Sequence, residues 1–320
     1  MLLAFVAIVV GLVLLVYGAD RFVTGAAQTA SSLGVPPLII GMTIVGIATS
    51  APEVLVGSVA ALQQKTNIAL GNALGSNIAN IGLVLGTTVL VSPLVTTSKT
   101  LRREYLIMFL ASVLALLLCL DQSLSRIDGA ILIISLLVIV TLIVRLAMTS
   151  PDTDPLASEF KQEYGELVPL KKSVVIIVIG LLLLLGGAEL LVRGAVYIAS
   201  TFGVSDLVIG LTIIAVGTSL PELAASIMSV IKKEADIAIG NVIGSNMFNM
   251  LMVLGVPSMI YPGEFGNEVL VRDFPVMIGF TLVMGAMVFY IGHGKFSRPE
   301  GFVLLSGFIA YQYWLFSTIS

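Results

Sequence analysis

Two glutamates lie where the chain carries few other charges. Glu53 and Glu222 each sit inside a long apolar segment, directly after a proline, in the stretches GIATSAPEVL and AVGTSLPELA. The hydroxyl residues before the two prolines are Thr49 with Ser50 and Thr218 with Ser219. Carboxylate and hydroxyl oxygens are the ligands that Ca²⁺ and Na⁺ prefer, whereas zinc, copper and iron favour imidazole and thiolate. The pattern therefore predicts a site for hard cations.

The two prolines add backbone oxygens to this set. Proline has no N–H to donate to the carbonyl four residues earlier, so the carbonyls of Ala48 and Gly217 lose their usual helical partners. Irregular backbone at membrane depth persists only where protein or a wet cavity receives it. A bound cation would satisfy these oxygens.

The segment that follows each glutamate supplies more oxygen ligands. It reads GNALGSNIAN in one copy and GNVIGSNMFN in the other. The polar residues of interest are Ser76, Asn77 and Asn80 in the first copy, and Ser245, Asn246 and Asn249 in the second. Residues four apart share a helix face, so each serine is expected beside the second asparagine that follows it. Glycines 71, 75, 240 and 244 have the small-xxx-small spacing that allows close helix approach.

Composition indicates the solvent in which these residues lie. The 320 residues are 58% hydrophobic and 11% charged, and the mean hydropathy is +1.08. These values predict a polytopic, all-α membrane protein that partners with the lipid bilayer. The net charge of −3 gives no sign of a nucleic-acid partner, and no obligate protein partner is evident. Cys119 is the single cysteine, which excludes an intrachain disulfide and favours a small packing residue.

Ten apolar runs are long enough to be membrane-spanning helices. They fall at residues 2–23, 36–62, 67–92, 101–120, 126–147, 171–199, 205–231, 235–261, 272–292 and 298–317. With the N-terminus outside, 12 of the 16 Lys and Arg residues fall on the inner side. Cytoplasmic loops carry the excess of Lys and Arg. We therefore expect a multi-pass protein of the cytoplasmic membrane with both termini outside.

The chain also contains an internal repeat. A shift of 169 residues aligns positions 18–86 with positions 187–255 without a gap, and 29 of the 69 pairs are identical. Each half holds five predicted helices, an odd number, so the repeats are expected to be inverted in the membrane. The predicted domains are a first five-helix repeat (1–147, with its motif at 36–92), a cytoplasmic linker (148–170) and a second five-helix repeat (171–320, with its motif at 205–261).

Glu53 and Glu222 are equivalent positions of this repeat, and they are the only deep acids of the predicted membrane core. A proline kink or a membrane serine alone usually serves packing. The same Pro-Glu pair at one depth in both halves, with matched hydroxyls and amides, instead favours function. Two carboxylates match the charge of one Ca²⁺ or two Na⁺, so these ions would compete for one set of ligands. A second pair of equivalent acids, Asp20 and Glu189, is expected near the end of the first helix of each half, where it lies at the membrane interface or lines an ion pathway.

The doubled motifs ATSAPE with GNALGSNIAN and GTSLPE with GNVIGSNMFN resemble the two alpha-repeats of the calcium/cation antiporter superfamily, in its sodium/calcium exchanger branch. The resemblance covers essentially the whole chain and is closest to compact prokaryotic members. It implies an inverted-repeat antiporter whose second, third, seventh and eighth helices surround the cation sites while the first and sixth slide across them. The ligands that it implies are Glu53, Glu222, Asn80, Asn249, Ser76, Ser245, Thr49, Ser50, Thr218 and Ser219, with the backbone carbonyls of Gly46 and Ala215 for sodium.

The sequence departs from this family pattern at two positions. Asn249 stands where some relatives carry an aspartate, including potassium-dependent exchangers, which makes potassium cotransport unfavoured. Ala48 stands opposite Gly217 of the other half, so the two broken helices need not be equally flexible.

The expected function is therefore sodium/calcium antiport, with no catalytic residues and no cofactor. A proton/calcium antiporter is the alternative, because a buried glutamate can carry a proton once its pKa rises. Proton-coupled relatives typically have an asparagine-rich motif where this chain keeps Thr and Ser. A calcium channel is a third possibility, distinguished by flux without a counter-ion gradient. An intramembrane protease would need a serine with a His or Lys base, or paired aspartates, at membrane depth, and the sequence predicts none there.

Overall fold

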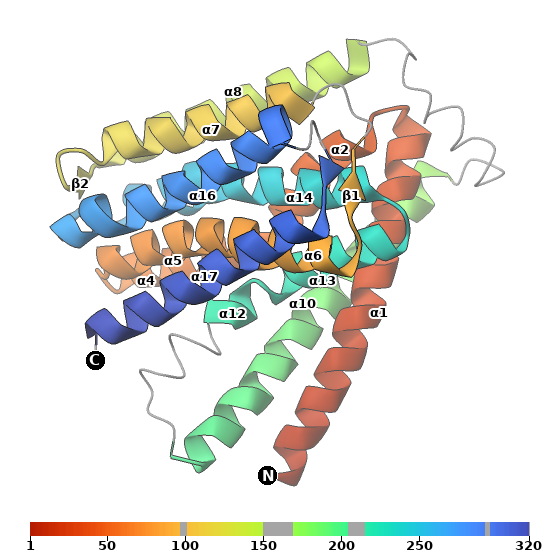
Figure 1. The fold of residues 1–320 in the computed structure, drawn as a ribbon, viewed down its shortest axis with the longest axis horizontal. Coiled ribbons are helices and arrows are strands. Elements are labelled where there is room, and N and C mark those ends of the chain that lie inside the picture. The colour runs from red at the N-terminus through yellow and green to blue at the C-terminus, as the bar shows by residue number, and fades with distance from the viewer. Residues whose placement is uncertain (97–100, 150–168, 204–214, 292–294, 320) are drawn as a thin grey trace.

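A computed structural model describes residues 1–96, 101–149, 169–203, 215–291 and 295–319. The described chain is helical, as predicted, and also contains four strands of two residues each (Figure 1). The elements of the first half are α1 (Leu2–Leu33), α2 (Pro37–Ile40), the π-helical turn η1 (Gly41–Val45), α3 (Gly46–Thr49), α4 (Ala51–Leu62), α5 (Thr66–Ala79), the π-helical turn η2 (Asn80–Leu85), α6 (Gly86–Val91), β1 (Leu94–Val95), α7 (Leu101–Leu118), β2 (Ser123–Leu124) and α8 (Arg126–Thr149).

The elements of the second half follow a similar order. They are α10 (Leu170–Thr201), α12 (Ala215–Thr218), α13 (Leu220–Ile231), α14 (Ala235–Phe248), η4 (Asn249–Val253), α15 (Gly255–Ile260), β3 (Gly263–Glu264), η5 (Val269–Asp273), α16 (Phe274–Ala286), η6 (Met287–Ile291), β4 (Lys295–Phe296) and α17 (Arg298–Ile319). The predicted linker 148–170 and the start of the predicted helix 205–231 lie largely outside the described residues.

The helices have the length and composition of a membrane protein. Within the described ranges, six helices are long and apolar enough to cross a membrane, and the bent pair Pro37–Thr49 and Ala51–Leu62 makes a seventh if it counts as one span. Large apolar side chains such as Leu3, Leu137 and Leu182 are exposed on their outer surfaces. Such surfaces fit lipid rather than water.

Element boundaries repeat at the sequence shift of 169 residues. The bounds of α4 shifted by 169 are those of α13, the bounds of α5 become those of α14, and β1 becomes β3. Gln64 and Lys233, which are equivalent positions, both have positive φ, at 61° and 64°. The strands pair crosswise, β1 with β4 and β2 with β3, both antiparallel. Sequence similarity between the halves thus extends to local structure.

One prediction about the helices was wrong. The first helix was expected at 2–23, but α1 continues to Leu33 and ends at Gly34, whose φ of 64° gives a left-handed cap. The polar residues of GADRFVTG do not end the helix, because buried positions such as Phe22 and Ala26 continue its packing face beyond the charges. Asp20 therefore lies within α1 and not near its end.

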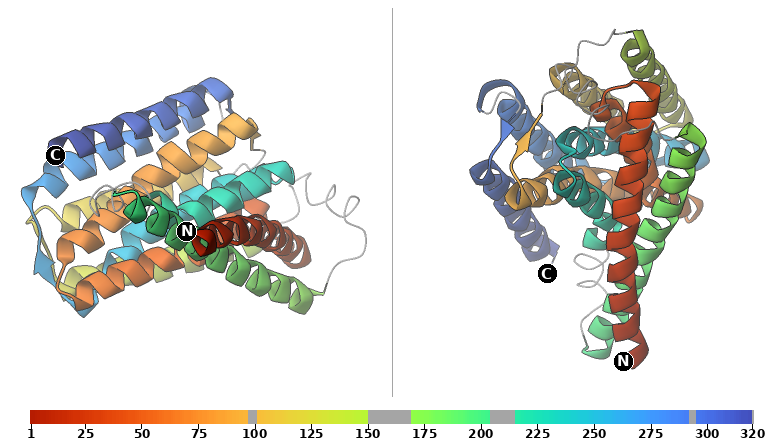
Figure 2. Two further views of the ribbon diagram at one scale, coloured as in Figure 1. Left: turned by 90° about the horizontal axis from the view of Figure 1, so that it is seen from below. Right: turned by 90° about the vertical axis from the view of Figure 1, so that its right-hand side faces the viewer.

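Helices α1 and α10 form a long pair that crosses the remaining helices steeply (Figures 1 and 2). Their contact is built on glycines at every seventh residue, which the sequence analysis did not identify. These are Gly11, Gly18 and Gly25 on α1, and Gly180, Gly187 and Gly194 on α10. A Cβ on Gly18 would lie 2.4 Å from the Leu184 nitrogen, so the backbones are in direct contact.

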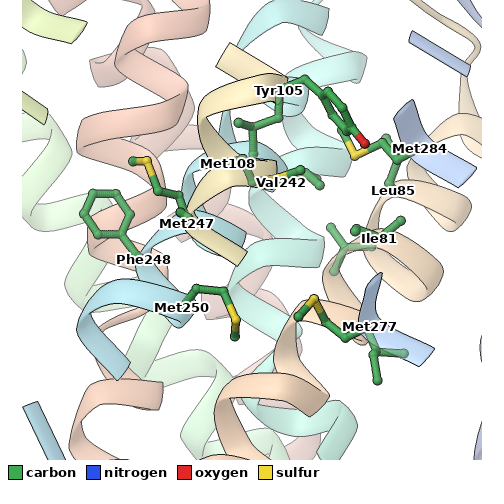
Figure 3. Packing of buried hydrophobic residues seen from close by; sticks show 14 of the residues in the cluster. Ile81, Leu85, Tyr105, Met108, Val242, Met247, Phe248, Met250, Met277 and Met284 are labelled. Atoms are coloured by element: carbon green, nitrogen blue, oxygen red, sulfur yellow. The ribbon is translucent and has the colours of Figure 1, made fainter. Parts of the chain in front are cut away.

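The core between the other helices is rich in methionine. Met108, Met247, Met250, Met277 and Met284 lie together with Phe248 and Tyr105 (Figure 3), and each of the methionines is fully buried. Methionine adapts its shape to irregular gaps. Cys119 is buried in the same core, as the sequence predicted. The core includes residues of α5 and α14, the two helices that carry the GN and GSN motifs of the repeat.

Adjacent glycines on α10 allow a matched test of the α1–α10 contact. A Cβ on Gly187 would lie 2.4 Å from the Leu15 nitrogen, whereas a Cβ on Gly186 has nothing within 4 Å. We expect Gly187→Ala to lower the melting temperature, because forced backbone separation costs about 1–3 kcal/mol. Gly186→Ala should leave it unchanged or raise it, since alanine favours helix by about 1 kcal/mol. Equal melting temperatures of the two variants in detergent would contradict this packing.

Candidate cation-binding site

The helix that carries Glu53 is broken just before the proline. The axis bends by 41° between Pro37–Thr49 and Ala51–Leu62, and the break falls at Ser50, with φ −81° and ψ 4°. The Gly46 carbonyl accepts the Ser50 N–H at 3.1 Å, and the Thr49 hydroxyl lies 3.5 Å from the same oxygen. In the other half, Ser219 separates α12 from α13 with nearly the same dihedral angles, −89° and 3°. Both prolines therefore interrupt a helix at the predicted place.

Both glutamates are buried without a compensating charge. Glu53 is 1% exposed and Glu222 is 2% exposed. Neither has a salt bridge within the described ranges, Glu53 Oε2 has no hydrogen-bond partner, and the Thr49 hydroxyl lies within hydrogen-bonding range of the Glu222 carboxylate. The two carboxylates lie close enough to repel each other. Burial of unpaired carboxylates is costly, so the pair is suited to binding cations.

A π-helical turn begins at each of the second asparagines. Asn80 opens η2 and Asn249 opens η4, and both side chains are at most 1% exposed. Neither the amide nitrogen nor the amide oxygen of either residue has a hydrogen-bond partner. π-helical turns are frequent at functional sites. Two polar amides thus lie in the interior with their oxygens free to act as ligands.

The packing brings residues of the two halves together. η2 packs against α13, which carries Glu222, and η4 packs against α4, which carries Glu53. The Thr49 and Ser245 hydroxyls are 3.3 Å apart. Close approach of η1 and α3 to α14 depends on glycine, because a Cβ on Gly244 would lie 2.2 Å from the Met42 carbonyl oxygen. Glycines 71 and 75 occupy the equivalent positions on α5, and the segment equivalent to η1 in the second half, residues 210–214, lies outside the described part of the chain.

The predicted site residues lie on α3, α4, α5, η2, α12, α13, α14 and η4, or at the breaks at Ser50 and Ser219. Thr49, Ser50, Ser76, Ser219 and Ser245 are buried, and the hydroxyl oxygens of Ser50 and Ser219 have no hydrogen-bond partner. Thr218 is half-buried at the end of α12. Ala215 begins α12, so its backbone is placed. Within the described ranges no three His, Cys, Asp or Glu side chains form a metal-binding group. Neutral oxygens would therefore have to complete the coordination that the two glutamates begin.

Sequence reasoning missed a second pair of asparagines that hold the glutamates in place. The Asn72 side-chain nitrogen donates to the Glu53 carbonyl oxygen at 2.9 Å, and that of Asn241 donates to the Glu222 carbonyl oxygen at 3.3 Å. Asn72 and Asn241 are equivalent positions of the repeat, in the GN pair that begins each motif. The presence of this asparagine at equivalent positions of both halves is the sequence feature that could have identified the pair.

A third pair of equivalent asparagines lies where the two halves meet. The Asn77 side-chain nitrogen donates to the Asn246 carbonyl oxygen at 3.2 Å, while that of Asn246 donates within its own helix to Val242 at 2.7 Å. Both side-chain oxygens are buried without a partner. The two halves are therefore not strictly symmetric here.

Asp20 and Glu189 lie apart from the buried ligands and form ion pairs of different kinds. Asp20 on α1 pairs with Lys232 at the end of α13, with the charged atoms 2.7 Å apart. Glu189 pairs with Arg193 one turn along the same helix, and both side chains are exposed. Asp20 thus links α1 to the end of α13, whereas the Glu189 pair lies on the exposed surface of α10 alone.

The chain is similar to known transport proteins over its whole length. The family model described as sodium/calcium exchanger protein matches residues 3–145 and 172–317. A putative antiporter CaxA from Alkalimonas amylolytica is 48% identical over 99% of this chain and 100% of that protein. The sodium/calcium exchanger MaX1 from Methanosarcina acetivorans is 31% identical over 98% of both chains.

A solved structure, that of the sodium/calcium exchanger from Methanococcus jannaschii, superposes with a TM-score of 0.83, 32% identity and coverage of 97% of both chains. The matched family ranges contain every predicted ligand, and both broken helices fall within them. The chain belongs to the sodium/calcium exchanger family.

Proposed function

We propose that this protein is a secondary active antiporter that exchanges sodium for calcium across the cytoplasmic membrane. The observation that carries the proposal is the pair of buried carboxylates, Glu53 and Glu222, which come from equivalent positions and lack a counter-charge among the described residues. Membership of the sodium/calcium exchanger family supports the same function.

The ligands are the oxygen atoms that surround the two carboxylates. Ca²⁺ takes six to eight oxygen ligands. Glu53 and Glu222 supply charge, the Gly46 and Ala215 carbonyls supply backbone oxygens, and the remaining ligands are neutral side chains. These are Thr49, Ser50, Ser76, Asn80, Thr218, Ser219, Ser245 and Asn249. No resident cofactor takes part, and the two ions are the transported substrates.

Charge balance explains why the two ions would exchange rather than leak. One Ca²⁺ or two Na⁺ neutralise the two carboxylates, whereas the empty site keeps two unpaired negative charges in a low-dielectric interior. A change of the empty protein from access on one side of the membrane to access on the other therefore has a high energy barrier. Transport of one ion in one direction becomes tied to transport of the other in the return direction.

The architecture proposed for this exchange has ten spanning helices in two inverted five-helix repeats, with both termini outside. Coincident element bounds at a shift of 169 residues and the crossed pairing of β1 with β4 and β2 with β3 support it. The glycine contact holds α1 and α10 as one unit, and this unit slides across the site to alternate access. The boundaries 1–147, 148–170 and 171–320 remain a prediction.

Proton/calcium antiport is the second candidate function. The name of the relative CaxA specifies an antiporter without specifying sodium. Thr49, Ser50, Thr218 and Ser219 in this chain favour sodium, because hydroxyl oxygens coordinate Na⁺ without changing their protonation state.

The first prediction concerns binding by the two glutamates. Ca²⁺ should raise the melting temperature of the purified protein, because a ligand that binds only the folded state stabilises it. Glu53→Gln and Glu222→Gln should abolish this rise by removing the charges that hold the ion. Glu104→Gln, a change at a buried carboxylate paired with Arg103, should retain it. A normal Ca²⁺-induced rise in both site variants would refute the site.

The second prediction concerns coupling. In proteoliposomes loaded with Na⁺, radioactive Ca²⁺ uptake should follow the imposed sodium gradient and stop when the gradient is collapsed. A proton gradient alone should not drive uptake. Because Asn249 is neutral, replacement of K⁺ by choline on both sides should leave the rate unchanged. Uptake that follows only the proton gradient would establish the proton-coupled alternative, and uptake without any counter-ion gradient would indicate a channel.

A further inference from the structure

Asn241 links residues of both halves around the candidate cation site. Its side-chain oxygen lies 3.1 Å from the Thr49 hydroxyl and 3.5 Å from the Ser245 hydroxyl, each of which donates to it. Its side-chain nitrogen donates to the Glu222 carbonyl oxygen at 3.3 Å and to the Ser226 hydroxyl oxygen at 3.0 Å. An amide has two donors and two acceptor positions, so this buried side chain uses all four.

The direction of a hydroxyl hydrogen decides whether the oxygen can bind a cation. A hydroxyl has one hydrogen and two lone pairs, and only the lone pairs attract a positive ion. The groups around Thr49 include the Glu222 carboxylate and three direct contacts. Of these three, the Asn241 oxygen is nearest, at 3.1 Å, against 3.3 Å for the Ser245 oxygen and 3.5 Å for the Gly46 carbonyl. With its hydrogen donated to Asn241, Thr49 presents its lone pairs elsewhere. For Ser245 the Thr49 oxygen is nearer, at 3.3 Å against 3.5 Å for the Asn241 oxygen, and donation to Asn241 leaves the lone pairs of both hydroxyls free.

The bonds made by the nitrogen fix which end of the amide faces these hydroxyls. Rotation of the Asn241 amide by half a turn would place its oxygen against the Glu222 carbonyl oxygen, and two acceptors would then face each other. Ser226 is fully buried on α13 and anchors the second N–H. The oxygen is thereby held toward Thr49 and Ser245.

This arrangement differs between the two halves. Asn72, the equivalent of Asn241, also donates to the backbone of its glutamate. The position equivalent to Ser226 is Gly57, which has no side chain to anchor an amide. At this position the second half therefore has a hydroxyl anchor, and the first half has none.

We propose that Asn241 is a positioning residue that orients the Thr49 and Ser245 hydroxyls so that their lone pairs face the transported cation, and that Ser226 locks its amide in the required direction. This inference rests on the proposed function, because it assumes that Thr49 and Ser245 are ligands. It assigns no direct contact between Asn241 and the ion.

The test measures ion binding apart from transport. Thermal-shift titrations with CaCl₂ alone and with NaCl alone give the half-saturating concentrations, and the melting temperature without added ion reports folding. Asn241→Leu should raise the half-saturating Ca²⁺ concentration about tenfold, and Ser226→Ala about threefold, the range expected when one hydrogen bond that supports a ligand is lost. Ser226→Thr keeps a hydroxyl and should restore the wild-type value.

Ser229→Ala is the matched control. Ser229 is also fully buried on α13, and its hydroxyl donates only within its own helix, to the Ala225 carbonyl at 2.8 Å. Its half-saturating concentrations should equal those of the wild type. If Ser226→Ala and Ser229→Ala shift binding equally, the effect is general packing and the proposal fails. Should Asn241→Leu not fold, the comparison of Ser226→Ala with Ser226→Thr decides the question.

The proposed function and the positioning role of Asn241 would be refuted by different results. If the wild type gives no melting-temperature shift with either ion, the proposed function and this inference both fall. If the wild type binds both ions and Asn241→Leu binds them with unchanged half-saturating concentrations, only the positioning role is overturned. If Ser226→Ala weakens binding and Ser226→Thr does not restore it, the positioning role is also overturned, because the effect then does not depend on the hydroxyl that anchors the Asn241 amide.

Discussion

The architecture of the site depends on one electrostatic constraint. The carboxylates of Glu53 and Glu222 are buried, and the described residues around them include no counter-charge. Repulsion between two such groups disfavours the site unless cations join it. The oxygens that surround this pair are neutral. They can coordinate a cation, but they carry no positive charge that would balance the two carboxylates. A site of this kind is more stable when cations occupy it, which is the physical basis of the proposed exchange.

Duplication provides the geometry that this constraint needs. One broken helix places one glutamate, and a second copy places the other, so a short motif used twice builds a two-sided site. Close approach of the copies relies on glycines such as Gly244, whose Cβ would meet the backbone of Met42. The copies differ in detail, since Asn77 donates across to the other half whereas Asn246 donates within its own helix. Strict symmetry would make the two access states equal, and these differences allow them to differ.

The sequence predicted the membrane class, the helix breaks at Pro52 and Pro221, and the burial of both glutamates, because each follows from the chemistry of the residue itself. It did not predict that α1 continues to Leu33, since helix length depends on packing partners that are distant in the chain. The roles of Asn72 and Asn241 were also missed. Their bonds go to backbone atoms 19 residues earlier, and such contacts become visible only when two helices are placed side by side. The glycines spaced by seven on α1 and α10 were present in the sequence as a regular pattern, but their partner helix was not.

Competition between the two ions for one set of oxygens is the central claim, and calorimetric titration of Ca²⁺ into the purified protein at a series of Na⁺ concentrations tests it most directly. Shared ligands predict that the apparent Ca²⁺ affinity falls steadily as Na⁺ rises, while the amount of Ca²⁺ bound at saturation stays constant. A Ca²⁺ affinity that does not change with Na⁺, at constant ionic strength maintained with choline, would show that the ions use separate sites and would contradict the account.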